Sequence, residues 1–163
     1  MSTSSVPVNK PDDDFLVVGR LDGTPLHLTL AFRNQCWEGD IQAMVDKAEG
    51  LLETPIVLQL GRHIWVGPKE ELESVSVSFP VPDQALQAKT YWDKFNRRSI
   101  AEAHYTFAPH ITLNSVEKRQ AMRELERNGH QATISRIFLY YLTDKRSARV
   151  VTCDKTHGKR EQV

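Results

Sequence analysis

Cysteine is scarce in this chain, which has only Cys36 and Cys153 among its 163 residues. Two cysteines are too few for a disulfide framework or for a cysteine zinc cage. No apolar run approaches the roughly 20 residues that a membrane-spanning helix needs. The first residues, MSTSSVPVNKPDDD, contain no apolar segment of the kind found in signal peptides. These absences favour a reducing compartment, and we expect a cytoplasmic location without membrane association.

Net charge is also absent, because 21 Lys and Arg residues balance 21 Asp and Glu residues. A protein that grips long nucleic acid usually presents a broad basic face, so a long polyanion is disfavoured as the usual ligand. Glycine-rich phosphate loops of the Walker or Rossmann type are missing, which disfavours kinases, GTPases and NAD enzymes. The composition is that of a soluble globular protein, with 40% hydrophobic and 26% charged residues. A small anionic ligand is compatible with this balance.

The residue pattern divides the chain into three parts. Residues 1–14, with their serines, prolines and acidic triplet, are typical of a flexible leader, and residues 154–163 of a polar tail. Between them, residues 15–153 alternate between strand and helix periods and predict a single α+β domain. We expect strands at 15–21, 26–32, 56–60, 63–67, 75–81, 109–114, 133–142 and 148–153, and helices at 40–52, 83–98 and 116–128.

Two of these helices carry more specific expectations. Asp40 has the residue type of an N-cap for the first helix. In the second helix, Leu86, Tyr91 and Phe95 are candidate core contacts. A hairpin around Asp144 is expected between the last two strands.

A weak internal repeat relates the two halves of the chain. Each half contains a strand, then a helix, then further strands, and each opening strand contains His-x-Thr-Leu. The repeat predicts a bilobal fold with two antiparallel-rich sheets, lobes related by a pseudo-two-fold axis, and helices on the outside. The two histidine strands are then expected to face each other across a cleft.

The two motifs are His27-Leu28-Thr29-Leu30 and His110-Ile111-Thr112-Leu113. Because side chains alternate along a strand, the histidine and threonine of each motif share one face, and the aliphatic residues share the other. Each strand is therefore expected to bury its aliphatic side and to present one imidazole and one hydroxyl together.

This set of groups suits phosphodiester chemistry without a metal ion. One neutral histidine can take a proton from the attacking water or ribose 2′-hydroxyl, and the other, protonated, can donate one to the departing oxygen. Threonine hydroxyls can donate hydrogen bonds to the phosphate oxygens. One such motif alone is more often structural, and a zinc site is the other common use of paired histidines. No histidine or cysteine partner at metal-ligand spacing completes a zinc site here, so we expect no metal and no cofactor.

The paired motifs, and FAPHITL (107–113) in particular, resemble the two-histidine (2H) phosphoesterase superfamily. That group includes LigT-like RNA phosphoesterases, 2′,5′-phosphodiesterases and phage anti-CBASS phosphodiesterases. The resemblance extends from about Phe15 to Cys153, although its specific part is the two motifs. It implies a bilobal fold, a metal-independent mechanism, and catalytic roles for His27, Thr29, His110 and Thr112. It leaves the subfamily open.

Several side chains are candidates for binding substrate near these motifs. Tyr105 and Phe107 precede the second motif, where either can stack on a nucleobase, although Phe107 equally suits the core. Trp65, and likewise Trp37, can stack on a base or pack in the core or at the rim. Candidate phosphate contacts are Arg62, Arg136 and Lys145, and ordinary surface roles are favoured for His63, His130 and His157.

Together these features predict a phosphodiesterase of the 2H type that acts on a small nucleotide. The expected substrates are a cyclic oligonucleotide signal, a 2′–5′ oligonucleotide or a 2′,3′-cyclic phosphate, which includes the possibility of a phage or viral anti-defence enzyme. Two other hypotheses stay open: a non-catalytic nucleotide-binding sponge with the same fold, and a LigT-like enzyme that processes RNA ends. The exact linkage, the roles of the two histidines and the oligomeric state are not determined by the sequence.

Overall fold

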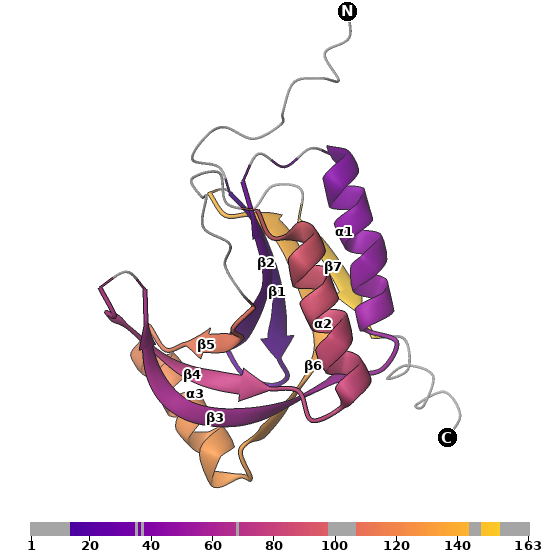
Figure 1. The fold of residues 1–163 in the computed structure, drawn as a ribbon. Coiled ribbons are helices and arrows are strands. Elements are labelled where there is room, and N and C mark those ends of the chain that lie inside the picture. Colours follow the sequence, from indigo (N-terminus) through magenta and orange to yellow (C-terminus); the bar gives the residue numbers. More distant parts are fainter. Residues whose placement is uncertain are drawn as a thin grey trace, which may run out of the picture.

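The computed structural model describes residues 14–34, 36, 38–67, 69–97, 107–143 and 148–153. In chain order these residues form β1 (Phe15–Leu21), β2 (His27–Arg33), α1 (Glu38–Leu51), β3 (Ile56–Val66), β4 (Leu72–Ser78), α2 (Pro82–Phe95), β5 (His110–Thr112), α3 (Val116–Arg127), β6 (Gln131–Tyr141) and β7 (Arg149–Thr152) (Figure 1). The expected leader, apart from Asp14, and the expected polar tail lie outside the described residues. Within the described part, no helix has the length and apolar character needed to cross a bilayer.

The strands form one antiparallel sheet in the order β2-β1-β6-β3-β4-β5, with β7 paired to β6. Strand β6 is the centre of this sheet because it uses both of its edges. One edge pairs with β1 through Ile134–Tyr141. The other edge pairs first with β3, through Gln131–Ile134, and then with β7, through Arg136–Leu139.

This shared edge corrects the expectation of two separate sheets. Strand β3 separates from β6 after Ile134, because β7 takes over the same hydrogen-bonding edge from Arg136 onwards. The group β3-β4-β5 therefore turns away from the group β2-β1-β6, although four residue pairs keep the sheet continuous (Figure 1). The α+β class is confirmed, whereas the pseudo-two-fold relation of the lobes stays a prediction.

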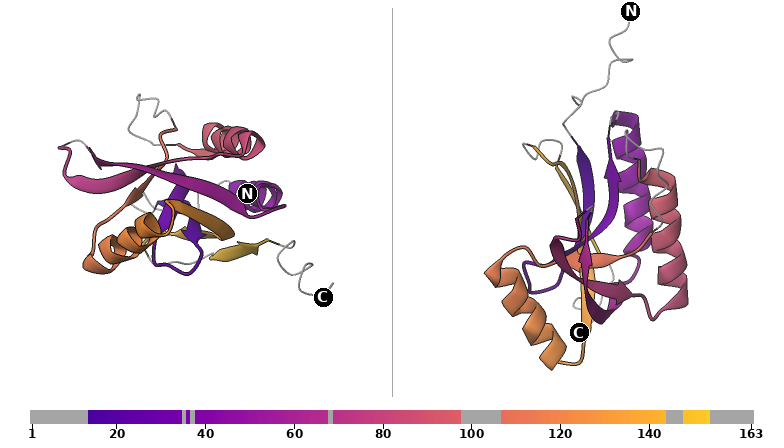
Figure 2. Two further views of the ribbon diagram at one scale, coloured as in Figure 1. Left: turned by 90° about the horizontal axis from the view of Figure 1, so that it is seen from below. Right: turned by 60° about the vertical axis from the view of Figure 1, so that its left-hand side comes forward.

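The helices cover the buried face of the bent sheet. Helices α1 and α2 lie side by side near β2 and β7, and α3 lies apart from them, where its Glu126 meets His63 of β3 (Figure 2). One contiguous cluster of buried side chains extends from Met44 in α1, along this face of the sheet, to Met122 in α3. In α2, Tyr91 and Phe95 are buried as expected, but Leu86 is 65% exposed and does not contribute to this core. The core thus holds both parts of the bent sheet together.

Local hydrogen bonds explain where two elements differ from the sequence prediction. Residues 56–66 form one strand rather than two, because a bulge between Leu60 and His63 lets the pairing with β4 continue. Gly61 permits the close approach there, since a Cβ at this position would lie 2.5 Å from the Ser76 hydroxyl oxygen. Asp40 is not an N-cap: α1 begins at Glu38, and the Asp40 carboxylate lies 3.4 Å from the Arg33 guanidinium.

We predict that Leu28→Ala destabilises the protein far more than Leu86→Ala. Leu28 has no exposed surface, so its truncation leaves a cavity and costs about 2–5 kcal/mol of unfolding free energy. Leu86 is mostly exposed and serves as the matched control, with an expected change within about 0.5 kcal/mol. Denaturant unfolding of both variants measures this difference, and equal losses would contradict the described core.

Candidate active site

The two His-x-Thr motifs occupy the two ends of the strand order. The first motif starts β2 and the second includes all of β5, and these strands are the edges of the path through the sheet. Strands β2 and β5 nevertheless contact each other, because the bend at β6 brings the two edges together (Figure 1). The motifs are 83 residues apart in the sequence, so their proximity depends on the whole sheet.

The motif side chains point to the faces that the two-residue period predicts. His27 and Thr29 are half-buried, whereas Leu28 and Leu30 between and beyond them have no exposed surface. In β5, His110 and Thr112 are half-buried on either side of the fully buried Ile111. Each edge strand therefore anchors an aliphatic side in the core and leaves an imidazole and a hydroxyl accessible.

A pocket of about 130 Å³ connects the two motifs. Thr29 contributes from β2, and His110 contributes from β5. Its remaining lining is mostly apolar and aromatic: Leu16, Phe32, Trp92, Phe107, Ala108 and Pro109. His27 and Thr112 do not line it, but each shares a strand face with a residue that does.

A bulge in β2 explains why Phe32 joins Thr29 in this pocket. The pairing with β1 shifts between Val17 and Val18, so Ala31 follows Leu30 into the core. Phe32 then returns to the same face as Thr29, three residues away. The pocket thus gains an aromatic ring that strict alternation would have directed into the core.

The ring of His110 is oriented by a backbone carbonyl. Its Nδ1 lies 2.9 Å from the carbonyl oxygen of Ala108, which can only accept a hydrogen bond. The neutral imidazole therefore carries its proton on Nδ1 and keeps a free electron pair on Nε2. On the neighbouring strand, Ser76 lies directly opposite His110.

Phe107 is part of the aromatic wall of the pocket. Its ring centroid lies 6.2 Å from that of Phe79 and 5.3 Å from that of Trp92. The sequence pattern does not point to Trp92. Trp92 reaches this region because the residues after α2 bond to the edge of β2: the Phe32 amide donates to Asn96 Oδ1, and the Arg97 amide donates to the Phe32 carbonyl.

The structure does not bring Trp65 to the motifs. Trp65 pairs with Glu73, and the next residue, Ser74, pairs with Thr112. Because adjacent residues of a strand point to opposite faces, Trp65 lies on the face of the sheet opposite Thr112. It shares that face with His63, whose Nε2 lies 2.7 Å from Glu126 of α3, in agreement with a surface role. The expected aromatic contacts at Tyr105 and Trp37, and the candidate Lys145, lie outside the described residues.

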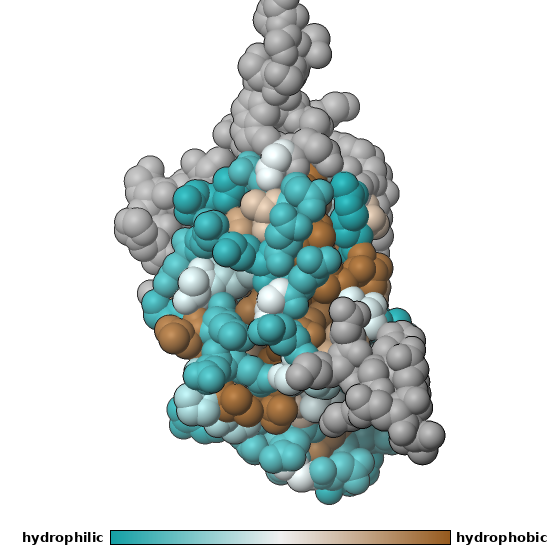
Figure 3. Space-filling model, turned by 90° about the vertical axis from the view of Figure 1, so that its right-hand side faces the viewer, coloured by the Kyte–Doolittle hydropathy of each residue, from teal (hydrophilic) through white to brown (hydrophobic). Residues whose placement is uncertain are grey.

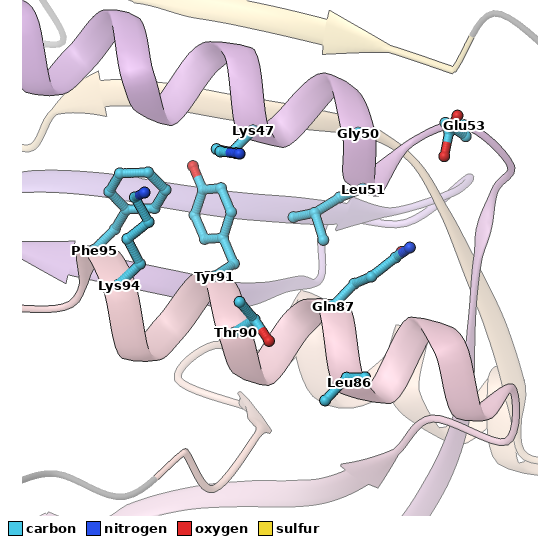
Figure 4. A pocket seen from close by; sticks show the side chains of 10 residues that line it. All are labelled: Lys47, Gly50, Leu51, Glu53, Leu86, Gln87, Thr90, Tyr91, Lys94 and Phe95. Carbon is cyan, nitrogen blue, oxygen red and sulfur yellow. The ribbon is translucent and has the colours of Figure 1, made fainter.

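A larger pocket of about 420 Å³ lies between α1 and α2 and contains no motif residue. Figure 4 shows side chains from both helices around it, with the Tyr91 ring reaching toward α1. The Tyr91 hydroxyl donates to the Met44 carbonyl, and burial raises the pKa of this phenol. Seen from this side, the surface alternates between hydrophobic and hydrophilic patches (Figure 3).

The described residues form no group of three or more His, Cys, Asp or Glu side chains suited to a metal ion.

Comparison with solved structures places the fold beside known phosphoesterases. A structure described as a phosphoesterase aligns with a TM-score of 0.52 and 15% identity, over 86% of this chain and 95% of that chain. The structure of E. coli LigT complexed with 3′-AMP aligns with a TM-score of 0.53 and 14% identity, over 86% of this chain and 94% of that chain. No family model and no curated protein matches the sequence. The chain therefore has the LigT-like α+β fold.

We predict opposite neutral tautomers for two histidines, which long-range ¹⁵N–¹H NMR correlations can distinguish. His110 should carry its proton on Nδ1, because this atom faces a carbonyl oxygen. His63 is the internal control and should carry its proton on Nε2, which faces the Glu126 carboxylate. The spectra are recorded at a pH where both imidazoles are neutral, and an Nε2 proton on His110 would contradict the described ring orientation.

Proposed function

We propose that this protein is a metal-independent phosphodiesterase that cleaves a small nucleotide with His27 and His110. The observation that carries this proposal is the meeting of the two edge strands, so that Thr29 of one motif and His110 of the other line one pocket. Two imidazoles on opposite sides of a phosphate provide both proton transfers of a phosphodiester cleavage. The LigT-like fold supports the same reaction class.

The orientation of His110 suits a proton transfer at Nε2. With Nδ1 bonded to the Ala108 carbonyl, Nε2 either accepts a proton when neutral or donates one when the ring is charged. His27 takes the complementary role, and the two roles exchange between consecutive steps. Thr29 and Thr112 donate hydrogen bonds to the non-bridging phosphate oxygens and hold the phosphorus between the rings.

The attacking group decides the product. When the free ribose hydroxyl beside the phosphodiester attacks (2′ in a 3′–5′ linkage, 3′ in a 2′–5′ linkage), its proton passes to the basic histidine and a 2′,3′-cyclic phosphate forms. The departing oxygen receives a proton from the acidic histidine. When water attacks a 2′,3′-cyclic phosphate, the same proton transfers open the ring to a monoester. Neither route uses a redox step or a further reactant.

The aromatic pocket favours a nucleotide as the substrate. Phe32, Trp92 and Phe107 offer ring faces beside Thr29 and His110, and aromatic rings stack on bases with little regard to sequence. E. coli LigT was solved with 3′-AMP, which supports a ligand of this class. The substrates to be tested are therefore cyclic dinucleotides and trinucleotides, 2′–5′ and 3′–5′ oligoadenylates, and RNA ending in a 2′,3′-cyclic phosphate.

We predict that His27→Ala and His110→Ala each lower kcat by about 10²- to 10⁴-fold, because each removes one proton transfer. The double variant should fall little further, since the two groups act in one step. His130→Asn is the control: His130 lies outside both motifs and has a φ of 59°, which asparagine tolerates. Products of the substrate panel are resolved by mass, and near wild-type turnover by either motif variant would contradict the proposal.

We also predict that turnover continues in excess EDTA, because imidazoles and hydroxyls provide all the proposed chemistry. Steady-state rates with and without chelator measure this, after the protein has been dialysed against the chelator. Loss of activity that one divalent ion restores would overturn the metal-independent mechanism. Binding of a nucleotide without any product would instead favour a nucleotide sponge.

A further inference from the structure

A row of three charged or ionisable side chains crosses the sheet at the His27 end of the site. In the pairing of β1 with β2, Arg20 lies directly opposite His27. In the pairing of β1 with β6, Arg136 lies directly opposite Arg20. Residues directly opposite each other in an antiparallel ladder point to the same face, so both guanidinium groups share the face of His27.

Both arginines lie against the same aromatic ring. The guanidinium carbon of Arg20 is 5.3 Å from the Phe138 ring centroid, and that of Arg136 is 5.7 Å from it. Arg20 also lies close enough to Tyr140 for its charge to oppose the rise in the pKa of that phenol caused by burial. Arg20 therefore leans along the face, over Phe138, toward the row that contains Thr29.

The two cations are not neutralised by acidic side chains of the described residues. Neither takes part in the ion pairs found there, and both side chains are exposed. The acidic residue nearest to Arg20 in sequence, Asp22, accepts hydrogen bonds from Thr133 and Ser135 instead. Like charges on directly opposite positions destabilise a sheet, and a bound anion relieves that repulsion.

We propose that Arg20 and Arg136 bind a second phosphate group of the substrate, adjacent to the phosphate held between His27 and His110. Guanidinium groups bind phosphate through two parallel hydrogen bonds, and stacking on Phe138 orients them in advance. This second site presupposes the proposed function of the first. It identifies the substrate class as a nucleotide with at least two phosphates, such as an oligonucleotide, rather than a cyclic mononucleotide.

The layout of the face supports this assignment. Along β2, Phe32 lies at the aromatic pocket, Thr29 is next, and His27 is at the end beside Arg20. A base in the pocket thus extends its phosphate toward the histidines and the following phosphate toward the arginines. Neighbouring strands are about 4.8 Å apart, so the arginines lie one and two strands beyond His27.

The test compares a diadenylate with the same diadenylate carrying an additional 5′- or 3′-phosphate, each in 2′–5′ and 3′–5′ linkage. Wild-type protein should show a KM about tenfold lower for a diadenylate with an additional phosphate. The Arg20→Gln/Arg136→Gln double variant should lose this preference, so that the KM values for the two kinds of diadenylate become equal. Arg123→Gln, an exposed arginine of α3, is the control for a lost positive charge and should keep the preference.

Binding to the His27→Ala/His110→Ala variant separates this inference from the proposed function. In calorimetry, the histidine double variant should bind the diadenylate with the additional phosphate more tightly than the plain diadenylate. This difference in affinity should disappear when both arginines are also replaced. If wild-type protein cleaves no member of the panel, the proposed function fails and the binding data alone decide the second site. Equal affinity for both diadenylates, or an equal loss of affinity for both in the arginine variant, would overturn the second phosphate site.

Discussion

The hydrogen-bond ladder of β6 is the constraint on which the rest of the molecule depends. This strand pairs with β1 on one edge and with β3 and then β7 on the other. The exchange of partners after Ile134 bends the sheet, and the bend brings β2 and β5 into contact. A slip of one residue along this ladder would reverse the faces of Arg136 and Phe138 and expose Ile137. The fold thus resists such a slip through its core, and the same resistance fixes the site.

The division of each motif between core and surface makes the site rigid. Leu28 and Ile111 have no exposed surface, so the backbone positions on either side of them have little freedom. His27, Thr29, His110 and Thr112 are those flanking positions. A catalytic group gains from a fixed position because misplacement by about 1 Å can cost about 10²-fold in rate. Burial of the aliphatic side therefore stabilises the fold and orients the polar side together.

Local patterns predicted the parts of the structure that depend on neighbouring residues. The two-residue period of His27-Leu28-Thr29-Leu30 predicts the correct faces. The helix expected over 116–128 begins where α3 begins, at Val116, and there the Ser115 hydroxyl accepts from the Lys118 amide. Errors arose where a bulge changes the period. The sequence does not reveal that Ala31 follows Leu30 into the core, and this change alone directs Phe32 into the pocket.

Other parts depend on pairings between distant residues, which no local pattern encodes. Trp65 was selected for its residue type, but its face is set by its partner Glu73 and by the bulge at Gly61. Trp92 was not selected, because its place beside Phe107 results from the bond between Phe32 and Asn96, which are 64 residues apart. The single sheet in place of two has the same origin in the shared edge of β6. Strand register and sheet topology are thus the features that the sequence pattern does not predict.

Charge placement, rather than total charge, decides what this protein can recognise. The chain is neutral as a whole, which disfavours a broad electrostatic grip on a long polyanion. Two guanidinium groups on one ring beside His27 nevertheless create a local positive site on the motif face. Arg123 and Arg127 belong to α3 and are not among the paired strand positions that form this row. Under the proposed second phosphate site, a suitable ligand is short and carries its phosphates close together, because one phosphate would lie at the histidines and the next at the arginines.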